Sequence, residues 1–183
     1  MLAYIPIVLA ILLSFQVFPV ALGIPGKEAP GKSILPIIIL ALTQVIMFLA
    51  GYYLGEKFMH LLRNHAAMVM FAGFFIIGIR MMMEVLKIRK GQRTYELTGE
   101  KSVFLVAFAQ SINTFLTGLL FFFIPVDMIV VPVVLLVTSL ALAAAGAFAG
   151  ITKTSLAFAS LLYLIAGILI IVSSVYFIFA PLI

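Results

Sequence analysis

Long apolar runs separated by short polar breaks dominate this chain. Six runs are apolar and long enough to cross a bilayer, which takes about 20 residues of helix. They occupy residues 4–23, 33–55, 66–86, 102–124, 127–150 and 156–180. Of the 183 residues, 66% are apolar and only 9% are charged, whereas a soluble domain carries roughly 25% charged residues. A soluble domain of this size has too little interior to hide that much apolar surface. The sequence therefore predicts an all-α integral membrane protein with six transmembrane helices.

The remaining composition excludes several classes of function. The net charge is +5, but the basic residues lie between the apolar runs, so they are expected to face lipid headgroups rather than nucleic acid. The chain has no cysteine, which excludes disulfides, a thiol nucleophile and a cysteine metal cluster. The first run lacks the basic start and cleavage site of a secretory signal, so it is expected to be a permanent span. The predicted partners are the lipid bilayer and a small ion or polar solute.

Lysine and arginine counts predict the orientation in the membrane. The first, third and fifth connections carry eight basic residues: Lys27, Lys32, Lys87, Arg89, Lys90, Arg93, Lys101 and Lys153. The connections on the other side carry only Lys57 and Arg63. Because positive residues favour the cytoplasm, both termini are expected to be extracytoplasmic.

The two halves of the chain resemble each other. Thr43-Gln44 precedes Gly51 and Gly55, and Thr138-Ser139 precedes Gly146 and Gly150, each 95 residues later. The segments SFQVF at 14–18 and SINTF at 111–115 are 97 residues apart. Two repeats, 1–90 and 100–183, would each hold three spans, and an odd number of spans places the second repeat upside down. Inverted repeats are typical of secondary transporters, which bind substrate near the midplane. Both Gly51/Gly55 and Gly146/Gly150 have small-xxx-small spacing, so they are expected to allow close helix contact. The alternative to a transporter is a generic helix bundle in which the glycines do only this.

Polar residues within the runs are the candidate substrate-binding residues. In the fourth run, four of them recur at i, i+3, i+4 and i+7, which places them on one helical face. In the first run, Pro19 cannot donate a hydrogen bond to the Phe15 carbonyl and is expected to kink the helix, which leaves backbone oxygen free. The candidates are Ser14, Gln16, Thr43, Gln44, Gln110, Asn113, Thr114 and Thr117.

Three of these residues, Gln16, Gln44 and Asn113, lie near the middle of their runs. We expect them to meet at the interface of the repeats as a ring of amide and hydroxyl oxygens. The alternative is that they only join helices by hydrogen bonds, each contributing about 0.6 kcal/mol.

Charged residues inside the runs are few. Arg80 and Glu84 are spaced i, i+4 near one end of the third run. They are expected to form a structural ion pair, or to be part of a gate. Asp127 is expected to cap the fifth helix. His60 and His65 are expected to lie in a loop and to be solvated rather than to bind metal. No nucleophile–base pair lies at membrane depth, so the chain is not expected to be an enzyme.

The segment Gly78-Ile79-Arg80-Met81-Met82-Met83-Glu84 is similar to the G-G-R-M-I-I-E stretch of the MntP-type manganese exporters, which belong to the LysE-like superfamily. The serine motif that opens each half and the glycine-spaced second and fifth runs also resemble that family. The resemblance implies an efflux transporter of a bacterial inner membrane, with manganese as the transported ion and no further cofactor.

The chain differs from the family pattern at three positions. The family has aspartate at the positions of Gln16 and Asn113, and commonly glutamate at the position of Gln44. The resemblance makes these three residues the candidate metal ligands, but amides lack the charge that favours a hard dication and do not titrate. Two functions therefore stay open. One is efflux of a divalent cation, or of a monovalent ion or neutral polar solute. The other is a non-transporting paralogue that acts as a membrane partner or regulatory subunit.

Overall fold

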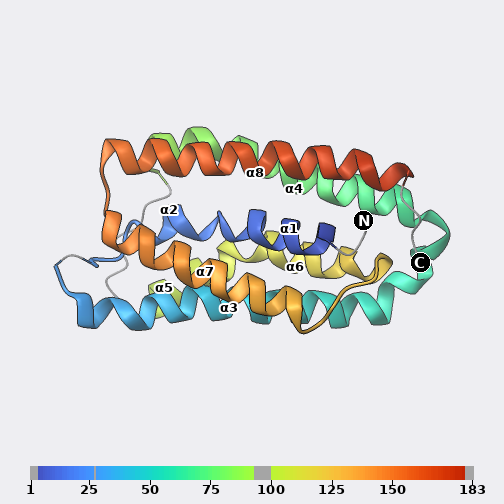
Figure 1. Cartoon of the computed structure of the whole chain (residues 1–183), viewed down its shortest axis with the longest axis horizontal. Coiled ribbons are helices and arrows are strands. Elements are labelled where there is room, and N and C mark those ends of the chain that lie inside the picture. The colour runs from blue at the N-terminus through green and yellow to red at the C-terminus, as the bar shows by residue number, and fades with distance from the viewer. Residues whose placement is uncertain (1–3, 27, 93–99, 180–183) are drawn as a thin grey trace.

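Every regular element in the described part of the chain is a helix. The computed structural model describes residues 4–26, 28–92 and 100–179. Its elements run in the order α1 (Ile5–Ser14), α2 (Val17–Ala21), α3 (Pro30–Phe58), η2 (Met59–His65), α4 (Ala66–Arg89), α5 (Glu100–Gln110), α6 (Ile112–Leu120), η3 (Phe121–Phe123), α7 (Val130–Ala149) and α8 (Lys153–Phe179). They lie side by side along the long axis of a bundle (Figure 1).

The helices are long and apolar enough for a multi-pass membrane protein. Four helical stretches of the described chain meet that condition, and a shorter apolar stretch, Ile5–Ala21, precedes them. The longest stretch, Pro30–Arg89, has 60 residues and would be about 90 Å long if straight, against a hydrocarbon core of about 30 Å. It is not straight, because η2 turns the chain so that α3 and α4 run along opposite sides of the bundle (Figure 1).

The first helical stretch is broken where the sequence predicts a kink. The amides of Phe15 and Gln16 bond three residues back, to Leu12 O at 3.3 Å and Leu13 O at 3.2 Å. These bonds end α1, and Pro19 lies in the first turn of α2, where a missing N–H is tolerated. The expectation of one helix over 4–23 is therefore corrected to two short helices.

A second break separates α5 from α6, and no proline causes it. The Ser111 amide is shared between the carbonyls of Ala107 and Phe108, both at 3.1 Å. Its hydroxyl donates to Ala107 O at 2.7 Å, a bond that tends to bend helices. The two breaks lie at the two copies of the serine motif.

Close helix packing depends on glycines at equivalent positions of the two halves. α3 packs against α6, and α7 packs against α1 and α2. A Cβ atom on Gly51 would collide with the Phe115 carbonyl oxygen, and one on Gly146 would lie 2.7 Å from the Phe18 carbonyl oxygen. The packing role predicted for these glycines is confirmed. It is wrong for Gly150, which ends α7 at φ +69° with no atom within 4 Å of an added Cβ.

The connections divide between the two ends of the bundle. The α7–α8 turn, the ends of α2 and α4, and the starts of α3 and α5 lie at one end, whereas η2 and the α6–α7 connection lie toward the other (Figure 1). The described basic residues of the first group are Lys32, Lys87, Arg89, Lys90, Lys101 and Lys153. Lys27 and Arg93 lie outside the described residues, as does the end of the last predicted run. The opposite end carries Lys57 and Arg63.

The outer surface is apolar, and the interior holds a second apolar layer. Ile46 and Val137 are 61% and 59% exposed, which is typical of lipid-facing side chains. Inside, Phe74 stacks on Phe177 of α8 with ring centroids 5.1 Å apart. Apolar side chains therefore form both the outer surface and much of the interior of the bundle.

Candidate functional site

Four polar side chains from three helical segments meet at the two helix breaks. Gln16 lies between α1 and α2, Gln44 lies in α3, and Asn113 and Thr114 lie in the first turn of α6. Their exposed fractions are 0%, 1%, 6% and 0%. We call these four residues the amide cluster.

Direct hydrogen bonds join the amide cluster. Gln16 Nε2 donates to Gln44 Oε1 at 3.0 Å and to Thr114 Oγ1 at 2.6 Å. Asn113 Nδ2 donates to Gln16 Oε1 at 3.2 Å. The Thr114 hydroxyl donates to Gln44 Oε1. The structure thus brings together the three amides expected to meet. Thr114, another of the candidate residues, links Gln16 to Gln44.

A second polar group lies beside the first helix break, where Ser14 meets two hydroxyl side chains of α7. Ser14 Oγ lies 2.6 Å from Thr138 Oγ1 and accepts a 3.3 Å hydrogen bond from Ser139 Oγ. Thr138 and Ser139 were not among the predicted site residues, although the repeat pairs them with Thr43 and Gln44. We call Ser14, Thr138 and Ser139 the hydroxyl cluster.

Thr43, in contrast, does not join the amide cluster. Its hydroxyl donates to the Ile39 carbonyl of its own helix at 2.7 Å. Threonine in helices commonly makes this bond. The predicted substrate contact of Thr43 therefore has no support in the described geometry.

Three polar residues on one face of α5 and α6 contain buried atoms without a hydrogen-bond partner in the described part of the chain. The atoms are Gln110 Nε2 and Oε1, Asn113 Oδ1 and Thr117 Oγ1. Leaving such an atom unpaired costs about 1–3 kcal/mol. The face predicted from the i, i+3, i+7 spacing thus lies inside the bundle with unused hydrogen-bonding capacity.

The hydrogen bonds described for the amide cluster do not include the two charged candidates. Arg80 is half-buried and Glu84 is buried, one turn apart on α4. Their ion pair or gate stays a prediction. His60 and His65 are exposed in η2, which replaces the predicted loop.

Asp127 binds the start of α7, but the helix begins later than predicted, at Val130, with Ile129 at the N-cap position. Its Oδ1 accepts hydrogen bonds from the amides of Ile129 at 2.8 Å and Val130 at 2.9 Å. These two bonds stabilise the carboxylate and lower the pKa of Asp127.

The amide cluster offers neutral oxygens to a cation. Among the described residues, no group of three His, Cys, Asp or Glu side chains could hold a metal ion. A cation in the cluster would therefore be coordinated by amide and hydroxyl dipoles rather than by carboxylates.

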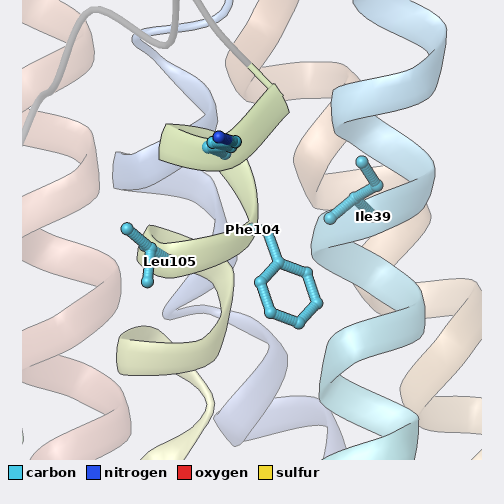
Figure 2. Close-up of a pocket in the computed structure, with 4 residues that line it drawn as sticks. Ile39, Phe104 and Leu105 are labelled. Atoms are coloured by element: carbon cyan, nitrogen blue, oxygen red, sulfur yellow. The ribbon is translucent and has the colours of Figure 1, made fainter.

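A groove between α3 and α5 is unsuited to an ion. It has a volume of about 480 Å³ and is lined by Ile39, Lys101, Phe104 and Leu105. Figure 2 shows the Phe104 ring in the space between α5 and Ile39 of α3. Three of its four side chains are apolar, so the groove provides few ligands for a polar solute.

A protein-family model described as "Putative manganese efflux pump" (Mntp) matches residues 30–178.

The chain belongs to the MntP family.

The match covers Gln44, Asn113 and Thr114 but begins after α2, so Gln16 and Ser14 lie outside it. These two residues belong to their clusters on the evidence of their hydrogen bonds alone. Comparisons with curated proteins and with solved structures found no match. The description of the MntP family is that of a membrane transporter and not of an enzyme class.

Proposed function

We propose that this MntP family member exports a small cation across a bacterial inner membrane, and that the amide cluster is its transport site. The single observation that carries the proposal is the set of hydrogen bonds that joins Gln16, Gln44, Asn113 and Thr114 at two helix breaks. Discontinuous helices at the interface of two repeats form the substrate sites of many secondary transporters. Manganese is the ion that the family description supports.

The proposal includes six spans arranged as two inverted repeats. The spans are α1 with α2, then α3, α4, α5 with α6, α7 and α8. The paired helix breaks and the reciprocal contacts of Gly51 with Phe115 and of Gly146 with Phe18 support the repeat. The basic residues gathered at one end support a cytoplasmic position for that end and extracytoplasmic termini.

Transport would proceed by rocking one repeat against the other. α3 packs on α6 of the second repeat, and α7 packs on α1 and α2 of the first. Movement along these two contacts would expose the amide cluster first to one side and then to the other. Each cluster lies at one of these contacts. The amide cluster includes Gln44 of α3, and the hydroxyl cluster includes Ser139 of α7.

The chemistry of the amide cluster permits a cation but predicts weak binding. Manganese accepts carbonyl oxygens as ligands, and Asn113 Oδ1 is a buried acceptor without a partner in the described chain. The oxygens of Gln16 and Gln44 already accept hydrogen bonds, so those bonds must open when an ion enters. Without carboxylates, the site cannot neutralise the charge of a dication.

One observation favours a second candidate function, a non-transporting paralogue. Gln16, Gln44 and Thr114 satisfy one another by hydrogen bonding in the buried interior. Such a closed set would join helices without any ligand. In this case the protein would act as a membrane partner or regulatory subunit.

Manganese flux in proteoliposomes separates the two functions. We expect the purified protein to move manganese faster than empty liposomes. A variant with Gln16→Asp, Gln44→Glu and Asn113→Asp should bind the ion more tightly, because carboxylates favour it. Thr43→Val is the matched control, since within the described chain the Thr43 hydroxyl bonds to α3 alone, and it should keep the native flux. Absence of flux in the native protein, with flux only in the triple variant, would contradict manganese export and favour the paralogue.

A further inference from the structure

A cavity at the basic end of the bundle combines two cations with a buried amide that has no partner. It has a volume of about 370 Å³, within the range of small-molecule sites. Nine described residues line it, and four of them are polar: Arg80, Lys87, Gln92 and Gln110. The others are apolar residues of α2, α5 and α6. No carboxylate is among the described lining residues.

The two cations lie on one face of α4. Seven residues correspond to almost two helical turns, so Arg80 and Lys87 point in similar directions about 10 Å apart along the axis. Lys87 is exposed, whereas Arg80 is half-buried. Glu84 lies between them in the sequence but does not line the cavity. The cavity therefore carries positive charge from its exposed mouth toward the interior.

Gln110 provides the second observation. It lines the cavity from the end of α5 and is only 4% exposed. Both polar atoms of its amide lack a partner within the described chain. A bound group with acceptor oxygens would give the Gln110 N–H groups the partner that they lack.

We propose that this cavity binds a small oxyanion, a phosphate or carboxylate group, through Arg80 and Lys87, with Gln110 donating from the interior side. Arginine and lysine are the usual partners of such groups, because their hydrogen bonds to oxyanions are charge-assisted. Basic pockets between membrane helices on the cytoplasmic side also bind lipid headgroups. The oxyanion could thus belong to an anionic lipid or be free in solution. None of the four residues of the amide cluster is among the described lining residues, and the proposal does not depend on which ion is transported.

Two binding measurements on the purified full chain test the proposal and separate the two sources. Equilibrium dialysis of delipidated protein against radiolabelled inorganic phosphate measures a free anion. Native mass spectrometry with added phosphatidylglycerol, compared with phosphatidylcholine, measures a headgroup. We expect saturable binding of one ligand per chain in at least one measurement. The variant Arg80→Gln with Lys87→Gln should weaken that binding at least about tenfold.

Matched variants keep the test decisive. Lys153→Gln removes an exposed cation that begins α8 and does not line the cavity, so it should bind like the native protein. Arg80→Lys keeps the positive charge and should retain most of the binding. It can still be measured if the double variant does not fold. The proposal is overturned if the native protein binds neither ligand saturably. It is also overturned if the folded double variant binds as well as the native protein, or if Lys153→Gln weakens binding equally.

Discussion

At the scale of single residues, Gln44 holds the amide cluster together. Its Oε1 accepts from both Gln16 and Thr114. Gln44→Leu removes this acceptor. The Gln16 amide then loses one of its hydrogen bonds, and the Thr114 hydroxyl loses the acceptor to which it donates. We expect the variant to lose about 1–3 kcal/mol of unfolding free energy, measured by denaturant unfolding in detergent.

Thr43→Val is the control for this loss, because it removes a bond made only within α3. It should cost less than Gln44→Leu. Equal losses in the two variants would show that the bonds of the amide cluster contribute no more than one local bond.

The sequence predicted the members of the amide cluster better than their contacts. Gln16, Gln44 and Asn113 lie in the middle of apolar runs, and this position was enough to predict that their side chains come together inside the bundle. That Thr43 turns away and Thr114 turns inward depends on helix rotation and packing, which spacing along one helix does not determine.

At the scale of elements, Asp127 controls the start of α7. Its pKa is lowered by the amides of Ile129 and Val130, so the carboxylate stabilises the folded state at pH values above the unfolded pKa of about 3.9. This stabilisation is lost as the pH falls through the lower folded pKa. We expect Asp127→Ala to melt at a lower temperature than the native protein at pH 7, with the difference shrinking at strongly acidic pH. A difference that does not change with pH would contradict the role of the carboxylate.

The helix contacts make a second prediction at this scale. Gly51→Leu and Gly146→Leu each place a side chain against the backbone of a neighbouring helix. We expect both to abolish the monodisperse protein peak in size-exclusion chromatography. Gly31→Ala is the control, because no atom lies within 4 Å of its added Cβ, and it should behave like the native chain. Tolerance of both leucines would contradict the close helix packing.

The two helix breaks show what can be predicted about elements. Pro19 predicted the first break, because proline removes a backbone donor. The second break has no proline, so only its equivalence to the first in the repeat could have indicated it. The fifth run was predicted to end at residue 150, and α7 does end there. The packing role expected of Gly150 was wrong, because its spacing from Gly146 matched that of a packing motif.

At the scale of the whole molecule, the apolar runs and the connections between them determine most of the fold. The runs predicted the long helices, and the segregation of basic residues agrees with the ends of the bundle at which the connections lie (Figure 1). The cavity at Arg80, Lys87 and Gln110 could not be predicted. It forms where α4 and α5 lie close together, and no sequence motif links the residues of these two helices.

The proposed alternating exposure of the amide cluster can be measured directly. The chain has no cysteine, so Asn113→Cys places the only thiol at the cluster. The protein is reconstituted in one orientation and treated with a water-soluble methanethiosulfonate reagent from either side. The account predicts labelling from both sides, slowed by manganese. A thiol unreactive from both sides, in a variant that folds normally, would contradict a transport site and show that the cluster only joins helices.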